Sequence, residues 1–418
     1  MIELSTGHTT VAIIGAGITG VTTAYKLARA GYKVTIFERH RYAAMETSFA
    51  NGGQLSASNA EVWNQWSTVL KGIKWMFMPG APLLVSPLPT WHKLSWMAEF
   101  LTSIPAYERN TEASARLAIA ARKHLREMAA DEGIDFDCED RGILHVYKTR
   151  GEFQHAERVT AMLKRAGLER QAVTPAEIRN IEPALQGEFF GGFFTPSDFT
   201  GDIHKYTTHL AAACQKRSVE TQYGTEIASI GSDGQTARLG LRTGSDAKIV
   251  TRSFDKVVIC AGVQSRSLAA SLGDRINVYP VKGYSITVNL ADQADREAAP
   301  WVSLLDDDAK IVTSRLGPDR FRVAGTAEFS GINRDIRHAR IAPLIAWCNR
   351  YFPKMSTRQS VPWSGLRPMM PDMMPRVRAG RRPNVFYNTG HGHLGWTLSA
   401  ITAEMTLGLI ETTDTGKH

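Results

Sequence analysis

The chain has 418 residues, of which 43% are hydrophobic and 22% charged, so it is an ordinary globular protein rather than a disordered or fibrous one. Its length suits two or three domains. The net charge of +8 is spread along the chain apart from a short basic run at 376–382, and no basic stripe alternates with aromatic residues, which argues against nucleic-acid binding.

The first forty residues predict a strand, a glycine loop, a helix and a second strand. A β-branched run at 11–14 leads into the pattern G-x-G-x-x-G. Its glycines are Gly15, Gly17 and Gly20. In a dinucleotide-binding unit the first permits a tight turn, the second admits the pyrophosphate, and the third lets the helix pack on the strand. Glu38 ends the second strand, 32–37, where a carboxylate accepts hydrogen bonds from ribose hydroxyls and repels a 2′-phosphate. The dinucleotide is therefore FAD or NAD.

Two later loops favour a flavin. The segment 45–56 is small, polar and rich in glycine, which predicts a loop that brings backbone groups close to a ligand. A nicotinamide dehydrogenase would normally continue with another βαβ unit instead. Near the other end, the glycine-rich loop 390–395 leads into a predicted helix at 396–410. Backbone N–H groups at such a helix start can face N1 and O2 of a flavin ring.

The middle of the chain alternates predicted helices and strands. We expect helices at 113–132, 152–166, 203–216 and 337–351. We expect strands at 142–147, 256–262, 279–290, 309–314 and 321–326. Asp198 and Asp202 are candidates to start the helix at 203–216. The segment 61–110 contains five tryptophans, which suit either the core or a lip at a membrane interface.

Several blocks of the sequence resemble the bacterial flavin-dependent D-amino acid dehydrogenases, within the D-amino acid oxidase and glycine oxidase superfamily. The blocks are 46–54, 71–77 with 81–83, 281–285, 365–369 and 388–397. They run through almost the whole chain. The resemblance implies an α/β fold with a discontinuous Rossmann-type FAD-binding domain and a substrate-binding domain built on a mainly antiparallel sheet. The expected FAD-binding domain comprises 1–60, 196–265 and 361–418, and the substrate-binding domain 61–195 and 266–360.

The resemblance also implies the residues of the site. FAD is expected to contact Gly15, Gly17, Gly20, Glu38, Arg39, Thr47, Ser48, Gly53, Gln54, Ile227, Gly262, Gly390, Gly392, Leu394, Gly395, Trp396 and Thr397. Arg367 is the expected partner of the substrate carboxylate, because a guanidinium binds a carboxylate through two parallel hydrogen bonds. Tyr284 is a candidate for the other carboxylate oxygen and Arg315 for a further pocket contact, each with a purely structural role as the alternative. His391 is the histidine expected nearest the flavin ring.

The implied reaction is oxidative deamination of a D-amino acid by hydride transfer from Cα to FAD, with electrons passed on to a quinone or another acceptor. A D-hydroxyproline or other imino acid dehydrogenase, an oxidase that uses oxygen, and a flavin-binding subunit without turnover stay open as alternatives. The chain departs from the family pattern at 56–59 and 371–378, so the substrate side chain stays open as well.

Location and metal binding follow from weaker signals. The first ten residues lack a signal-peptide pattern, and no apolar run reaches the length of a spanning helix. The four cysteines are scattered, which suits free thiols in a reducing cytoplasm. We therefore expect a cytoplasmic protein, with peripheral contact to the inner face of the cell membrane as the alternative. His204 and His209 fit a helical metal pair poorly, so we expect no metal site.

Overall fold

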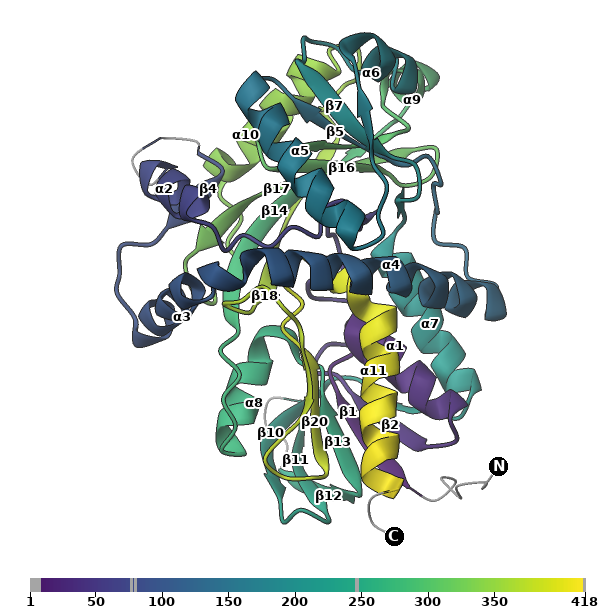
Figure 1. The fold of residues 1–418 in the computed structure, drawn as a ribbon. Helices are drawn as coiled ribbons and strands as arrows, with labels where there is room; N and C mark the ends of the chain where they lie inside the picture. The colour runs from purple at the N-terminus through teal and green to yellow at the C-terminus, as the bar shows by residue number, and fades with distance from the viewer. Residues whose placement is uncertain (1–8, 76–77, 79–80, 245–247, 416–418) are drawn as a thin grey trace.

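The computed structural model describes residues 9–75, 78, 81–244 and 248–415. Two large sheets lie at opposite ends of the molecule, and the long helix α4 (Tyr107–Asp131) crosses between them (Figure 1). The first eight residues, which bear on the expected lack of a signal peptide, lie outside the described part. So do Met76 and Phe77, which belong to one of the family-like blocks.

The first sheet has six strands in the order β19-β20-β13-β1-β2-β9. The strands are β1 (Thr10–Ile14), β2 (Lys33–Phe37), β9 (Glu220–Gln222), β13 (Lys256–Ile259), β19 (Arg376–Ala379) and β20 (Val385–Thr389). All neighbours are parallel except β19 and β20. The carboxyl ends of the parallel strands therefore meet at one edge, which is where open α/β sheets bind ligands.

Side chains alternate along the central strand β1 and build a layer on each face. Val11 and Ile13 pack with three helices: α1 (Ile18–Arg29), α7 (Ile203–Lys216) and α11 (Gly395–Thr415). Ala12 and Ile14 pack on the opposite layer. That layer contains β10 (Thr225–Ser232), β11 (Ala237–Thr243), β12 (Val250–Phe254) and the helix α8 (Ser265–Ser271). Both faces of the sheet are thus covered, as its apolar strands require.

The second sheet has nine strands in the order β18-β14-β17-β16-β15-β5-β7-β6, with β4 beside β17. They are β4 (Leu83–Val85), β5 (Ile143–Tyr147), β6 (Gln171–Val173), β7 (Gly191–Thr195), β14 (Tyr279–Asn289), β15 (Ser303–Asp306), β16 (Ile311–Arg315), β17 (Arg320–Phe329) and β18 (Ser360–Met369). The pairing is antiparallel except for β15 with β5 and β17 with β4. The helix α10 (His338–Tyr351) packs on one face through Ile341 and Leu344.

The remaining elements lie around the two sheets. They are α2 (Trp66–Trp75), α3 (Trp91–Thr102), α5 (Arg150–Arg165), α6 (Pro175–Ile181), α9 (Gln293–Ala298) and the strand pair β3 (Gln54–Leu55) with β8 (Phe199–Thr200). Short 3₁₀ turns cover Ile104–Ala106, Gly262–Gln264 and Gly392–Leu394. Figure 1 shows α2 and α3 on the same side of the molecule, α2 near β4 and α3 next to the start of α4.

Most predicted elements are present, with shifted ends. The helix α7 has its predicted bounds, whereas α4 already begins at Tyr107 and α11 continues to Thr415. Asp202 caps α7 by accepting hydrogen bonds from the backbone of His204 and Lys205, as predicted. Asp198 does not: its carboxylate accepts hydrogen bonds from the backbone N–H groups of 57 and 58 instead.

Candidate functional site

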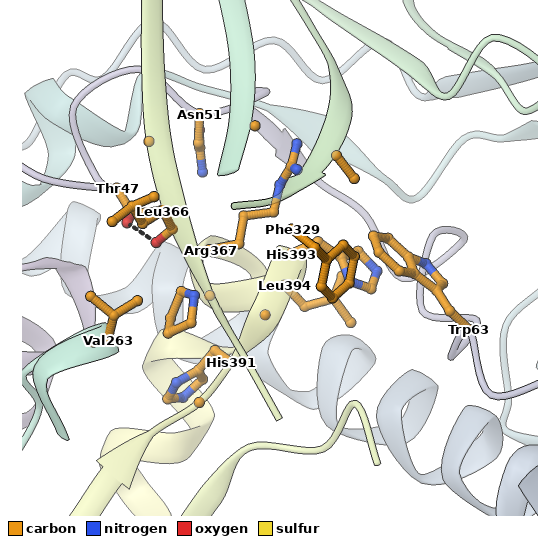
Figure 2. A pocket seen from close by; sticks show the side chains of 18 of the residues that line it. Thr47, Asn51, Trp63, Val263, Phe329, Leu366, Arg367, His391, His393 and Leu394 are labelled. Atoms are coloured by element: carbon orange, nitrogen blue, oxygen red, sulfur yellow. Dashed lines mark hydrogen bonds between the residues drawn. The ribbon is translucent and has the colours of Figure 1, made fainter. Parts of the chain in front are cut away.

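A cavity of about 1500 Å³ opens at the carboxyl edge of the six-stranded sheet and extends under the nine-stranded sheet toward α2 and α3. Typical small-molecule pockets measure ~300–1,000 Å³, so this cavity has room for a dinucleotide and a second ligand. Figure 2 shows part of its lining, in which Arg367 and two histidines come from different segments of the chain.

The glycine loop forms one end of the cavity. Gly15 has φ +104°, and a side chain there would also meet the carbonyl of Cys260, 2.7 Å from its Cβ. A Cβ on Gly20 would lie 1.9 Å from the Gly15 carbonyl, so this glycine serves helix packing and is not part of the cavity lining. A Cβ on Gly17 would meet only Ser48 Oγ, at 3.4 Å. The N-cap residue Gly17 has no side chain, and Ser48 Oγ accepts the N–H of Ile18, at 3.0 Å. The N–H groups of Thr19 and Gly20 have no partner among the described residues, so the first turn can still receive an anion.

The predicted acid lies where the second strand ends. Glu38 lines the cavity, and its two carboxylate oxygens accept hydrogen bonds from the backbone N–H groups of Ala16, at 2.8 Å, and His40, at 2.9 Å. These bonds fix the carboxylate beside the glycine loop. Each oxygen keeps a further lone pair for a ligand hydroxyl.

The loop at 46–56 forms a second wall. Thr47 donates a hydrogen bond from Oγ1 to the Leu366 carbonyl, at 2.8 Å, which ties the loop to β18. Gln54 donates from Nε2 to Ser303 Oγ, at 2.8 Å. Its Oε1 is buried and has no hydrogen-bond partner among the described residues. A buried amide oxygen is costly to leave unpaired, so the cavity offers a place for a donor.

The loop at 390–395 forms the third wall. Gly390 and Gly392 have φ +75° and +60°, and Cβ atoms there would collide with Met370 and Met369. The helix α11 begins directly afterwards, at Gly395. His391 donates a hydrogen bond from Nε2 to Thr402 Oγ1, at 3.0 Å, because that hydroxyl itself donates to a backbone carbonyl. Burial lowers the pKa of His391 to about 3, so the ring is neutral at ordinary pH.

Arg367 extends from β18 over Gly283, where a Cβ would lie 2.4 Å from the guanidinium carbon. Its Nη1 donates to the carbonyl of Thr326, at 2.9 Å. No carboxylate pairs with it among the described residues, and burial lowers its pKa to about 10. It stays protonated at neutral pH, and a desolvated, unpaired cation is costly unless an anion joins it. This part of the cavity is therefore suited to an anionic group.

Two residues predicted to contact the substrate bind other groups of the protein instead. Tyr284 borders the cavity, but its hydroxyl donates to Glu328 Oε2 at 2.8 Å, and its ring packs in the cluster under α10. Arg315 is not part of the cavity lining. Its guanidinium donates to four backbone carbonyls, those of 296, 299, 317 and 318. The predicted pocket role of Arg315 is therefore wrong, and the structural alternative holds.

The other predicted residues come together. Every residue expected to contact the cofactor lines the cavity apart from Gly20, and Arg367 and His391 line it too. The lining also includes three residues that were not predicted as site residues, His393, Trp63 and Thr326. The available signals were the second histidine of the 390–395 loop and the tryptophan-rich segment. A strained threonine in a strand leaves no such signal.

The cavity also contains charged groups near α5. Glu61 accepts hydrogen bonds from Tyr107, at 2.6 Å, and lies 3.2 Å from His155 Nε2. Lys310 pairs with Asp307 at 2.6 Å. These groups satisfy one another, so they do not by themselves select a ligand charge. In the described ranges no cluster of histidine, cysteine or acidic side chains is arranged to bind a metal ion.

A model of the family of FAD dependent oxidoreductases known as DAO matches residues 10–409. The chain belongs to this family. It is 60% identical over 402 residues to D-amino acid dehydrogenase 3 of Mesorhizobium japonicum, a match that covers 96% of this chain and 97% of that protein. It is 42% identical to the D-amino acid dehydrogenase of Paramagnetospirillum magneticum, over 96% of this chain and 94% of the relative.

Solved structures show the same fold. Glycine oxidase from Geobacillus kaustophilus matches with a TM-score of 0.74 at 21% identity, over 96% of this chain and 94% of that chain. L-proline dehydrogenase from P. horikoshii matches with a TM-score of 0.76 at 15% identity, over 97% of this chain and 93% of that chain. At these identities the likeness establishes the α/β fold alone.

The residues present fit FAD. The first turn of α1, where Ser48 takes only the N–H of Ile18, and the open space at Gly17 suit the pyrophosphate, and Glu38 suits the ribose. The buried Oε1 of Gln54 and the buried Nε1 of Trp396 both lack partners among the described residues. An acceptor and a donor thus remain for the polar edge of a flavin ring.

Proposed function

We propose that this FAD-dependent oxidoreductase converts D-amino acids into imino acids, which water then hydrolyses to 2-oxo acids and ammonia. The observation that carries the proposal is the unpaired Arg367 in a cavity that also contains the FAD loops. The D configuration is supported by relatives at 60% and 42% identity that are named D-amino acid dehydrogenases.

The chain's own residues would bind and orient the substrate. Arg367 binds the carboxylate through two N–H groups, while its bond to the Thr326 carbonyl fixes the direction of the fork. Bound FAD supplies the acceptor for the hydride that leaves Cα. The amine is neutral when the hydride leaves, so the C=N nitrogen that forms is positively charged and loses a proton afterwards. Apolar walls that include Trp63 and Phe329 exclude water around the reacting carbon.

We further propose that electrons leave to a quinone held in a membrane. The patch that we call the α2–α3 patch consists of the exposed residues Trp66, Leu70, Ile73, Leu88, Trp91 and Leu94. Trp66, Leu70 and Ile73 recur at helical spacing along one face of α2, and α3 lies on the same side of the molecule (Figure 1). Ile73 and Leu94 also line the cavity, so the patch is continuous with it.

Exposed aromatic and aliphatic side chains with adjacent lysines suit an anionic membrane surface. Lys71 and Lys74 of α2 are exposed. No helix within the described ranges is long and apolar enough to cross a bilayer. Contact would therefore be peripheral, with the cavity opening toward the lipid that contains the acceptor.

The reaction is tested by anaerobic absorbance of the purified holoenzyme with a panel of D-amino, L-amino and imino acids. Bleaching of the visible flavin band by D-amino acids is the expected result. Bleaching only by cyclic imino acids such as hydroxyproline would favour an imino acid dehydrogenase. Reoxidation of the flavin by oxygen alone would favour an oxidase. No bleaching by any compound would overturn the proposal.

Two arginine variants test the assignment of the carboxylate site. Arg367→Ala is expected to lower kcat/KM at least about hundredfold and Arg367→Lys about tenfold, with FAD still bound, because charge-assisted hydrogen bonds are lost. The matched control is Arg315→Lys, a buried arginine outside the cavity. It is expected to lower Tm and leave KM unchanged. An unchanged KM in Arg367→Ala would contradict the assignment.

A further inference from the structure

His393 occupies a fixed position between Arg367 and Trp63 in the cavity wall (Figure 2). Its ring stacks on Trp63, with a centroid distance of 5.0 Å and an interplanar angle of 21°. Its Nε2 lies 3.2 Å from the backbone carbonyl of Asn59. Two contacts on different sides therefore hold the ring, and neither involves its Nδ1.

The Asn59 contact determines the tautomer. A carbonyl oxygen can only accept, so Nε2 must carry the proton. In a neutral ring, Nδ1 then has a free lone pair. Nδ1 has no hydrogen-bond partner among the described residues. It is also not one of their fully buried polar atoms, so it keeps some exposed surface. Because the ring lines the cavity, we take this surface to face the cavity.

The surroundings keep the ring neutral. Burial, together with the positive charges of Arg367 and Lys310, lowers the pKa of His393 to about 4, against the opposing effect of Glu61. The histidine therefore presents an acceptor at ordinary pH, close to the Arg367 cation that is proposed to bind the carboxylate. His391 does not present such an acceptor in the same place, because it lies deeper and hydrogen-bonds to Thr402 of α11.

We propose that His393 Nδ1 accepts a hydrogen bond from the substrate amine, an inference that rests on the proposed amino acid substrate. This contact would make the site selective for 2-amino acids over other 2-substituted acids. Arg367 holds the carboxylate and His393 the nitrogen, which fixes two of the four groups on Cα. The nitrogen becomes positively charged as Cα loses its hydride. An acceptor already in place is therefore worth more in the transition state than in the ground state.

Two substitutions separate the ring's two nitrogens. His393→Gln can keep a donor for the Asn59 carbonyl but removes the acceptor at the Nδ1 position. His393→Asn places a carbonyl oxygen near the Nδ1 position and gives up the Asn59 contact. His92→Gln is the matched control, because His92 is also half-buried, lies 3.0 Å through Nε2 from the Val278 carbonyl, and is outside the cavity lining.

The direct readout is ligand binding to the holoenzyme, which is measured through the shift that it causes in flavin absorbance. The probes are 2-aminoisobutyrate and pivalate, which share size and carboxylate, lack a Cα hydrogen and differ only in amine against methyl. We expect wild-type protein to favour the amine about tenfold, as one hydrogen bond allows. His393→Gln should remove this preference, whereas His393→Asn and His92→Gln should retain most of it.

Turnover gives the second readout. His393→Gln is expected to lower kcat for D-amino acids about ten- to hundredfold with FAD content unchanged, and His393→Asn to recover part of the loss. A preference for the amine that survives in His393→Gln would overturn the inference, as would equal loss in His92→Gln. If wild-type protein is reduced by no amino or imino acid, the proposed function itself fails, which is a separate result.

Discussion

Thr326 combines strain with an unpaired hydroxyl beside Arg367. It has φ +59°, rare for a β-branched residue, and its buried Oγ1 lacks a partner among the described residues. The register explains its position: Lys282 pairs with Glu328 but Tyr284 pairs with Gly325, so two residues of β17 oppose one of β14. This is a β-bulge of the kind that usually contains glycine.

Thr326→Gly is therefore expected to stabilise the protein by about 1 kcal/mol, because relief of strain and of the unpaired hydroxyl exceeds the entropic cost of glycine. It should also lower kcat/KM about three- to tenfold, because the carbonyl that orients Arg367 becomes mobile. The control is Ser218→Gly, at φ +64° just after α7, which should stabilise without a change in activity. Thermal unfolding and steady-state kinetics measure both. Loss of stability in Thr326→Gly would show that the strain is smaller than inferred.

At the scale of elements, Gly17 and Gly20 separate ligand binding from folding within one loop. A Cβ on Gly20 would lie 1.9 Å from the Gly15 carbonyl, so Gly20→Ala is expected to destabilise the fold by about 3 kcal/mol or more. A Cβ on Gly17 meets only Ser48 Oγ at ordinary contact distance. Gly17→Ala should fold normally and bind FAD weakly, so that added FAD no longer raises Tm. Equal FAD affinity in Gly17→Ala and wild type would contradict this role.

Glu220 connects the six-stranded sheet to the layer beneath it. Its carboxylate accepts two hydrogen bonds from Arg252 of β12, both at 2.9 Å, and one from Thr35 of β2. The Arg252 guanidinium is the main cause that lowers the pKa of Glu220 to about 2. Because the folded pKa lies below the unfolded one, the stabilisation is present above about pH 4.5 and is lost as pH falls toward 2.

Glu220→Gln should therefore flatten the dependence of the urea midpoint on pH between 5 and 3. The variant is expected to be less stable than wild type at pH 7 and closer to it at pH 3. Glu127→Gln is the control, since its lysine partner Lys123 lies 3.7 Å away on an exposed helix face. Parallel pH profiles for wild type and Glu220→Gln would show that the pair contributes nothing.

Local patterns predicted the elements well and the direction of single side chains poorly. The glycine loop, the bounds of α7 and the cap at Asp202 depend on neighbours in sequence, so they were predicted correctly. The direction of the Tyr284 hydroxyl was not predicted, because the bulge between β14 and β17 and the packing of α10 decide which face its ring takes. Arg315 is bound by carbonyls up to 19 residues away, a contact that no local pattern contains.

At the scale of the whole molecule, the chain passes repeatedly between the two sheets. Strands of the six-stranded sheet come from 10–37, 220–259 and 376–389. This agrees with a discontinuous arrangement, although the predicted domain boundaries themselves stay a prediction. One segment differs: β18, placed in the FAD-binding domain by the sequence, pairs with β14 in the nine-stranded sheet. The strand that carries Arg367 thus belongs to the sheet above the cavity.

The tryptophan-rich segment has buried and exposed members, and the predicted lip at a membrane stays a proposal. Trp96 is 3% exposed and packs in the core, whereas Trp66 and Trp91 are 62% and 80% exposed in the α2–α3 patch. Exposed tryptophans at such positions cost solubility without adding packing, so a surface function accounts for them best. A membrane that receives the patch would bring its quinone to the cavity, which the patch borders.

The combined variant Leu70→Ser and Trp91→Ser is therefore expected to lower partitioning onto vesicles of anionic lipid at least about tenfold, because two large apolar contacts are lost. Reduction of the flavin by substrate should stay unchanged, since neither residue lines the cavity. Turnover with a long-chain quinone in vesicles should fall, whereas turnover with a water-soluble acceptor should not. Val361→Ser, an exposed apolar site on β18 outside the patch, is the control for surface apolarity. Equal vesicle binding by the double variant and wild type would show that the patch serves a different partner.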